Sequence, residues 1–358
     1  MKQWINRREF ITASTAVATE LSFGAGSSAA QTPAGRPGGN LTIAQGPATP
    51  VARLTFKTKP HKALIARPTE DDLKRLKDVG FEGVEGRSSV KPDEAARIRA
   101  VASKLGMRIH SVLIDNWGEF NSPDKSVVER SLAESQAALR TAEAFGADTV
   151  LLVPGRIGGG GGGGAPQAPA LRMPRPWEFQ IEFNEKNGHL LRAVCGDNAP
   201  YADFFKAHDD ATDRTAEALK RLIPFAEKAK VVIAVENVGN NLWVQPKIFR
   251  HYIQSFQSPW IQAYFDIGNH VRFAPPEQWI LTLNTLIAKI HVKDYLLDPA
   301  DPNGRGAGVD LREGSVRWPV LRQAIEAINY NGWMTIESNA SLSYEERSRR
   351  LDLILAGQ

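Results

Sequence analysis

The sequence has almost no cysteine and no apolar run that could span a bilayer. Cys195 is the only cysteine among 358 residues, so the chain forms no intramolecular disulfide and no multi-cysteine metal site. The most apolar N-terminal run is too short and too polar to cross a membrane. Both absences point to a soluble protein without disulfide or thiolate-metal cross-links, and no stable membrane insertion is expected of the mature chain.

A strongly basic pattern is absent as well. The formal net charge is only +4, from 44 Lys and Arg against 40 Asp and Glu, and residues 1–30 contribute +2 of it. No stripe of Lys and Arg follows a course that would match a phosphate backbone. We therefore expect no nucleic-acid partner.

Phosphate-binding glycine motifs are also absent. The segment ALIARPTEDD (63–72) follows the first apolar run without the glycine turn that an open nucleotide-binding sheet needs. The seven glycines at 158–164 lack a GK[ST] ending, and no helix pattern begins after them. This glycine run is expected to be a flexible tether rather than a phosphate loop.

The N-terminus carries the features of a targeting segment. Arg7 and Arg8 precede Phe10 and a moderately apolar run, which ends in small residues at Ala30. Residues 1–30 thus resemble a twin-arginine export signal, with a disordered tail as the alternative, and residues 31–55 indicate a Pro- and Gly-rich linker. The resemblance implies the twin-arginine export machinery as a partner and a periplasmic or secreted mature protein.

From residue 61 the chain alternates short apolar runs with amphipathic helical patterns. Alternation of this kind predicts a parallel sheet, and eight repeats in about 300 residues favour a closed (β/α)8 TIM barrel over an open doubly wound sheet. We assign the barrel to residues 56–358. The apolar runs cover residues 62–66, 81–86, 108–114, 148–155, 231–237, 261–268, 288–295 and 333–339.

A long insertion, residues 156–205, interrupts the pattern after the fourth run. Apolar residues alternate with polar ones from Trp177 to Phe183, NEKNG supplies a turn, and HLLRAV returns. This pattern predicts a β-hairpin. A lid over the strand-four end of the barrel is one interpretation; a surface decoration or an oligomer contact is the other.

The last four strands each present a polar side chain near the carboxyl end. These residues are Glu236, Asp266, His291 and Glu337. Active sites of such barrels lie at that end, and three carboxylates with one imidazole would repel one another unless a cation joined them. We therefore predict one divalent metal ion, with Mn²⁺ expected and Mg²⁺, Co²⁺ or Zn²⁺ as alternatives. The competing interpretation is four unrelated strand-end caps or salt bridges.

The motifs around these residues carry a family resemblance. VEN, FDIGN, HVKD, LREGSVRWP (311–319), IES and the earlier GADTVLLVPG together resemble the xylose isomerase-like barrel superfamily, in its sugar (phosphate) isomerase/epimerase group. The resemblance covers most of residues 61–340. It implies that Glu236, Asp266, His291 and Glu337 bind the metal and that Glu236 and Glu337 transfer the proton.

One position departs from the family pattern. The best-characterised ketose epimerases carry a histidine three residues after the strand-six aspartate, whereas Asn269 stands there and His270 follows. We therefore expect His270 to contact substrate, with a hydrogen-bonded role behind the site as the alternative.

Further substrate contacts are expected near the strand ends. The polar candidates are Glu85, Arg87, Asn237 and Lys293, and the aromatic platforms are Trp117 and Trp243. For Lys293 a salt bridge to Asp294 or Glu313 is the alternative, and for the indoles it is core packing.

This arrangement supports proton abstraction next to a carbonyl through an enediolate. The expected protein is a metal-dependent isomerase or epimerase that acts on a free sugar or sugar derivative. Two alternatives remain: a 3-keto-glycoside lyase that uses the same chemistry, and a non-catalytic sugar-binding protein. A three-zinc endonuclease on the same barrel is disfavoured, because only seven histidines are present and most lie away from strand ends.

Overall fold

The computed structural model describes residues 55–158, 171–337 and 341–358. The expected export signal, almost all of the linker and most of the glycine run lie outside these residues. The described residues from 55 onward belong to one compact unit. Among them, no helix is long and apolar enough to cross a membrane.

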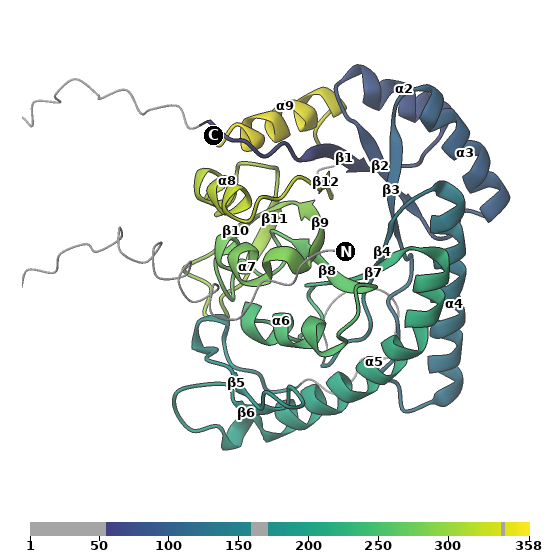
Figure 1. The fold of residues 1–358 in the computed structure, drawn as a ribbon. Helices are drawn as coiled ribbons and strands as arrows, with labels where there is room; N and C mark the ends of the chain where they lie inside the picture. Colours follow the sequence, from purple (N-terminus) through teal and green to yellow (C-terminus); the bar gives the residue numbers. More distant parts are fainter. Residues whose placement is uncertain (1–54, 159–170, 338–340) are drawn as a thin grey trace, which may run out of the picture. The chain divides into compact units, whose positions relative to one another are not determined.

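Eight parallel strands close into a barrel, which confirms the fold predicted from the alternating pattern (Figure 1). Around the barrel the order is β1-β12-β9-β8-β7-β4-β3-β2, so each strand pairs with its neighbour in the repeat. The strands are β1 (His61–Ile65), β2 (Gly83–Arg87), β3 (Arg108–Leu113), β4 (Thr149–Leu152), β7 (Val232–Glu236), β8 (Ile261–Asp266), β9 (Ile287–Val292) and β12 (Trp333–Ile336).

Helices surround the strands, and local signals set several of their limits (Figure 1). Thr69 caps α2 by accepting a hydrogen bond from the N–H of Asp72, and Gly146 ends α4 at φ 72° in the left-handed region. The helices are α2 (Glu70–Asp78), α3 (Pro92–Lys104), α4 (Lys125–Phe145), α5 (Ala202–Ala229), α6 (Pro246–Ser255), α7 (Pro276–Leu283), α8 (Trp318–Ala327) and α9 (Tyr344–Leu355), with 3-10 turns η1 (Pro176–Glu178), η2 (Ala199–Tyr201) and η3 (Asn284–Leu286).

The inside of the barrel is partly polar. Its apolar portion is a small cluster of Leu151, Val153, Ala234 and Tyr264, separate from the main core between strands and helices. Asp266 and Thr335 are both paired in register with His291, so these three residues lie at one level of the barrel. This register brings side chains from strands far apart in sequence to the same depth.

The insertion contains the predicted hairpin, but the hairpin is shorter than expected. Only β5 (Glu182–Phe183) and β6 (Leu190–Arg192) pair, antiparallel, because η1 takes up Trp177 at the start of the predicted strand. Phe179 is buried in edge contacts with Phe204 of α5 and with Phe273, which follows β8. The insertion therefore packs near the carboxyl ends of the strands. Whether it acts as a lid stays a prediction.

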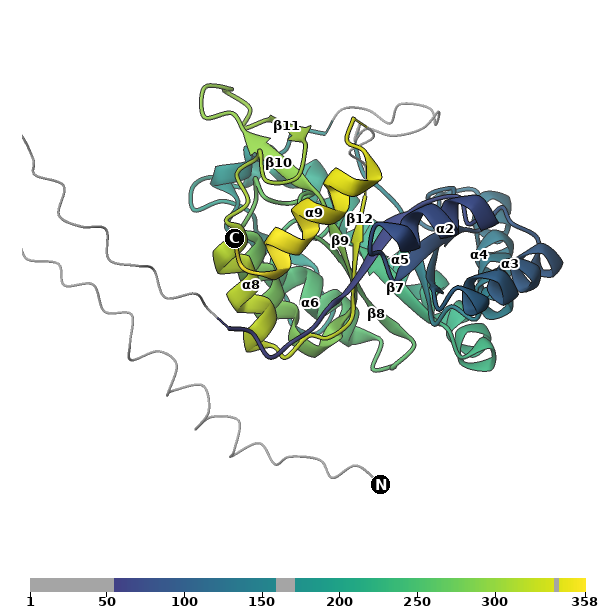
Figure 2. The same ribbon diagram turned by 90° about the horizontal axis from the view of Figure 1, so that it is seen from above.

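A second hairpin follows β9, where the sequence predicted one continuous strand to residue 295. β10 (Asp294–Leu297) pairs antiparallel with β11 (Gly306–Val309), and Figure 2 shows the pair projecting beyond one end of the barrel. Because β9 leads directly into β10, this is the carboxyl end of the strands.

Candidate metal centre

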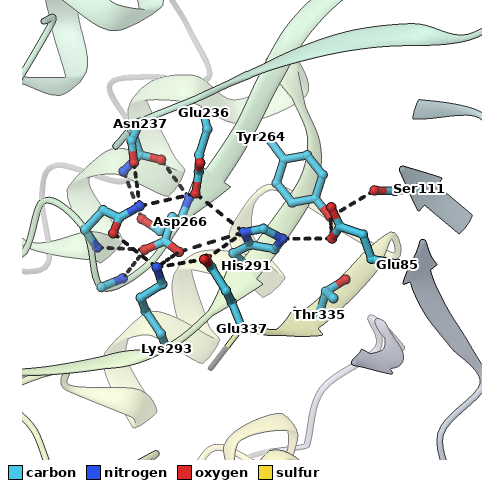
Figure 3. A network of polar contacts seen from close by, with 12 residues as sticks. Glu85, Ser111, Glu236, Asn237, Tyr264, Asp266, His291, Lys293, Thr335 and Glu337 are labelled. Atoms are coloured by element: carbon cyan, nitrogen blue, oxygen red, sulfur yellow. Dashed lines mark hydrogen bonds and ion pairs between the residues drawn. The ribbon is translucent and has the colours of Figure 1, made fainter. Parts of the chain in front are cut away.

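Four side chains from four adjacent strands converge at the carboxyl end of the barrel (Figure 3). Glu236 ends β7, Asp266 ends β8, His291 lies near the end of β9, and Glu337 follows β12. Each offers one ligand atom, and these atoms all lie within 4.8 Å of one another. The barrel therefore brings together all four residues that the sequence predicts as ligands.

The distances within the cluster suit a shared cation. Nδ1 of His291 lies 3.0 Å from Glu337 Oε2, 3.5 Å from Glu236 Oε1 and 3.9 Å from Asp266 Oδ2. His291 Nδ1 and Asp266 Oδ2 are buried and face other members of the cluster: Nδ1 lies 3.0 Å from Glu337 Oε2, and Oδ2 lies 3.2 Å from Lys293 Nζ. Neither atom makes a hydrogen bond of regular geometry with a described residue, so both are suited to bind a metal ion. Three carboxylates and one imidazole are a donor set for Mn²⁺, Mg²⁺, Co²⁺ or Zn²⁺.

Lys293 reaches into the same cluster. Its Nζ lies 2.8 Å from Glu337 Oε2 and 3.2 Å from Asp266 Oδ2. The expected alternative partners are engaged elsewhere: Glu313 pairs with Arg350, and Asp294 accepts backbone N–H groups of the loop after β11. The salt bridge expected to Asp294 or Glu313 is therefore wrong.

The pKa values reflect crowded negative charge. Burial raises the pKa of Asp266 to about 7. The positive charge of Lys293 lowers this pKa, and the negative charges of Glu337 and Glu236 raise it. Burial also raises the pKa of Glu236. For Lys293, burial opposes the charge, but the neighbouring carboxylates outweigh it and raise the pKa. Burial likewise disfavours the Glu337 carboxylate, yet His291 and Lys293 hold its pKa well below the usual range. A divalent cation would relieve this repulsion.

Glu85 lies inside the barrel, behind His291. Its side chain is fully buried, and its Oε2 lies 2.8 Å from His291 Nε2 and accepts a 2.7 Å hydrogen bond from the Tyr264 hydroxyl. His291 and Tyr264 thus engage the Glu85 carboxylate inside the barrel, and its predicted contact with substrate stays a prediction.

Two asparagines hold the end of β8 in place. The Asn237 side chain donates to the carbonyl oxygen of Asp266 (2.9 Å) and accepts from its N–H (2.6 Å), so this buried residue ties the end of β7 to the end of β8. Asn269 donates to Glu236 Oε1 (3.2 Å), and its Oδ1 lies 3.2 Å from Lys293 Nζ. The sequence marked position 269 only as a departure from the family histidine, so its contact with the cluster was missed.

His270 turns away from the cluster. It is buried, and its Nε2 hydrogen-bonds the carbonyl oxygen of Val238 at 2.9 Å. Burial lowers the pKa of His270 to about 3. This hydrogen bond fits the alternative, a hydrogen-bonded residue behind the site, and the expected substrate contact stays a prediction.

The remaining predicted substrate contacts, Trp243, Arg87 and Trp117, differ in how far their side chains are exposed. Trp243 is buried, stacks on Tyr252 with ring centres 3.7 Å apart and donates a hydrogen bond to Thr212, which fits the alternative of core packing. Arg87 is exposed at the end of β2 and pairs with Asp115 at 3.2 Å. Trp117 is half-buried against the apolar cluster inside the barrel, and its role as a platform stays a prediction.

Sequence comparison identifies the family. The family model described as xylose isomerase-like TIM barrel matches residues 73–175 and 187–353. The chain belongs to this family. None of the curated protein sequences compared with the chain matches it.

Solved structures of similar fold include several sugar enzymes. One is the 3-keto-D-glucoside 4-epimerase of E. coli, 14% identical, with a TM-score of 0.57 over 83% of this chain and 99% of that one. A D-psicose 3-epimerase studied with D-fructose is 12% identical, with the same TM-score and coverage. A xylose isomerase-like protein from Mycobacterium smegmatis in complex with magnesium is 18% identical, with a TM-score of 0.53 over 84% and 96%. At these identities the likeness shows a common fold.

Proposed function

We propose that this protein is a divalent-metal-dependent sugar isomerase or epimerase that removes a proton next to a carbonyl. The convergence of Glu236, Asp266, His291 and Glu337 on one point is the observation that carries the proposal. The sugar epimerases among similar structures support the substrate class.

Within the proposed reaction, the four clustered residues would hold the ion. When bound, the ion supplies positive charge that polarises a sugar carbonyl and stabilises the enediolate formed from it. Glu236 comes from β7 and Glu337 follows β12, with β8 and β9 between them. The two carboxylates are therefore placed to reach one substrate carbon from different sides, one to remove the proton and the other to return it.

Three other side chains are proposed to face substrate. Lys293 is partly exposed, with 20% of its side chain accessible, and its ammonium lies among the carboxylates, where it can bind a sugar hydroxyl or a developing oxyanion. Trp117 offers a half-buried indole, and Arg87 is exposed at the end of β2. Glu85, Asn237, His270 and Trp243 are buried, and we do not propose that they face substrate.

The decisive experiment measures proton exchange. Purified protein loaded with Mn²⁺ is incubated in D₂O with free ketoses and keto-glycosides, and deuterium uptake at the carbon next to the carbonyl is followed by NMR. We expect uptake that EDTA abolishes and that Glu236→Gln or Glu337→Gln lowers by about 10²–10⁴-fold. Absence of exchange, together with unchanged sugar binding by Glu236→Gln, would instead identify a non-catalytic binding protein.

A 3-keto-glycoside lyase is the second candidate. The similarity in fold to a 3-keto-D-glucoside 4-epimerase makes keto-glycosides substrates to include in the same screen. A lyase would expel the glycosidic leaving group from the enediolate, so release of that group separates it from an epimerase.

We also propose export by the twin-arginine route, on the basis of the pattern at residues 1–30. N-terminal sequencing of protein from a periplasmic fraction should then find Gln31 as the first residue. An uncleaved chain confined to the cytoplasm would contradict this proposal.

A further inference from the structure

The barrel interior contains a carboxylate whose burial needs an explanation. Glu85 has no exposed surface, and its Oε1 makes no hydrogen bond with any described residue. An isolated buried carboxylate is costly unless a partner compensates its charge. The hydrogen-bond partners of its other oxygen, Oε2, are His291 and Tyr264 (Figure 3).

The two nitrogens of His291 point in opposite directions. Nε2 lies 2.8 Å from Glu85, whereas Nδ1 faces Glu236, Asp266 and Glu337. A neutral imidazole carries a single N–H, and a carboxylate can only accept a hydrogen bond. With a cation bound at Nδ1, the single N–H of a neutral imidazole would lie on Nε2, where Glu85 accepts it, so Glu85 favours the form of His291 that binds a metal through Nδ1.

The surroundings also fix the orientation of the imidazole ring. The Tyr264 ring lies 4.4 Å from the His291 ring between centres, and the Tyr264 hydroxyl donates to the same Glu85 oxygen. Ser111 Oγ lies 3.4 Å from that hydroxyl. Glu85, Tyr264 and His291 come from three strands, β2, β8 and β9. Their contacts connect these strands inside the barrel.

We propose that Glu85 is a positioning residue that fixes the tautomer and orientation of His291 for metal binding through Nδ1. The proposal rests on the metal centre of the proposed function. Partners of this kind behind a ligating histidine increase its basicity, and their loss typically weakens metal affinity by about 10–100-fold. Glu85 acts through His291 and does not touch substrate.

The test compares metal affinity in Glu85→Gln and wild type, measured with Mn²⁺ and Zn²⁺ against a chromophoric chelator. The glutamine has almost the same shape, but its amide can donate to Nε2 as well as accept from it. We expect about 10–100-fold weaker binding. Glu85→Asp keeps an acceptor on a shorter side chain and should restore part of the affinity. Tyr264→Phe keeps the carboxylate and should weaken binding by less, about 3–10-fold.

A spectroscopic measurement reports the tautomer directly. Long-range ¹H–¹⁵N NMR spectra of histidine-labelled, Zn²⁺-loaded wild type should show His291 protonated on Nε2 and bound to the metal through Nδ1. In Glu85→Gln at the same Zn²⁺ concentration, part of the His291 population should lack the Nδ1–metal signal, because the ring is no longer held with Nδ1 toward the cluster. A role limited to packing would lower stability without changing this signature.

Glu326→Gln is the matched control. This carboxylate also accepts several hydrogen bonds, from the N–H groups of Lys57 and Thr58 and from the Thr58 hydroxyl, but it lies in α8, away from the cluster. We expect a lower melting temperature and unchanged metal affinity.

If folded Glu85→Gln has the metal affinity of the wild type and the His291 tautomer of the wild type, this inference is overturned, but the proposed function is not. If that variant does not fold, an unchanged affinity in Tyr264→Phe would overturn it. Failure of the wild type to bind either ion would overturn both the inference and the proposed metal centre. Metal binding with the expected losses but without sugar turnover would leave the inference standing and refute the proposed enzyme.

Discussion

Lys293 places an ammonium group among the carboxylates that would bind the metal. The ammonium neutralises part of the negative charge of Asp266 and Glu337, and it also repels a metal ion bound by these carboxylates. Lys293 therefore has two opposing effects that a single substitution can separate.

Lys293→Met should tighten metal binding and slow turnover. Repulsion between unit charges about 4 Å apart is about 4 kcal/mol at an effective dielectric constant of 20, so a fraction of it suffices for about tenfold higher Mn²⁺ affinity. Loss of the ammonium near the substrate oxygens should lower kcat by about 10²-fold. Chelator competition and steady-state kinetics measure the two effects.

Lys289→Met is the control for the loss of a buried lysine. The Lys289 ammonium pairs at 2.7 Å with Asp148, which directly precedes β4 at the amino end of that strand. Metal affinity should not change in this variant. Weaker metal binding by Lys293→Met would show that the ammonium organises the carboxylates instead of competing with the ion.

His270 should make stability depend on pH. Its folded pKa is about 3, lowered by burial, against about 6.5 when unfolded. Between these values the unfolded chain binds more protons, so stability falls as pH decreases below about 6.5, by about 1.4 kcal/mol per pH unit at most. His270→Gln should be less stable at pH 7 but lose less stability between pH 7 and 5. Urea unfolding at both pH values measures the difference, and equal losses in the two proteins would contradict it.

At the scale of elements, Asp294 organises the loop that follows the β10–β11 hairpin. Its carboxylate accepts hydrogen bonds from the N–H groups of Arg312 (2.9 Å) and Gly314 (3.0 Å) and from the indole of Trp318 (3.1 Å). Asp294 directly follows Lys293, so this loop is anchored next to the candidate site.

Asp294→Ala should destabilise the protein strongly. Several buried donors would lose their acceptor, at about 1–3 kcal/mol each, so we expect a loss of at least about 3 kcal/mol in the free energy of unfolding. Asp298→Ala removes an exposed carboxylate that accepts from the N–H of Ala300, and should cost about 1 kcal/mol or less. Urea denaturation compares the two, and similar losses would show that the Asp294 network contributes little.

Local signals predicted most element limits. Thr69 and Gly146 bound their helices through capping, which depends on a few neighbouring residues. The break between β9 and β10 was missed, since Tyr295 continues the apolar pattern. Only the pairing of β10 with β11, far along the chain, separates the two strands.

At the scale of the molecule, closure of the barrel assembles the candidate metal centre from residues 101 positions apart, Glu236 to Glu337. A metal ion bound there would join β7, β8, β9 and β12. Binding to the folded state alone would therefore stabilise the whole barrel.

Removal of metal should lower the melting temperature by several degrees. An ion at about 1,000 times its Kd stabilises the folded state by about 4 kcal/mol. Calorimetry with EDTA, and after return of Mn²⁺, measures the shift. The shift should be much smaller in Glu236→Gln, and a wild-type melting temperature that does not respond to millimolar Mn²⁺ would argue against a metal site.

The sequence by itself determined the eightfold alternation of strands and helices and the four polar residues at the ends of the last four strands. Both depend on local periodicity, so they could be predicted without coordinates. The tertiary structure alone decided which side chains meet: Glu85 reaches His291 across the barrel, whereas His270 and Trp243 turn into the core. The direction of a side chain near a strand end depends on register and on packing between distant strands, and neither can be read from neighbouring residues.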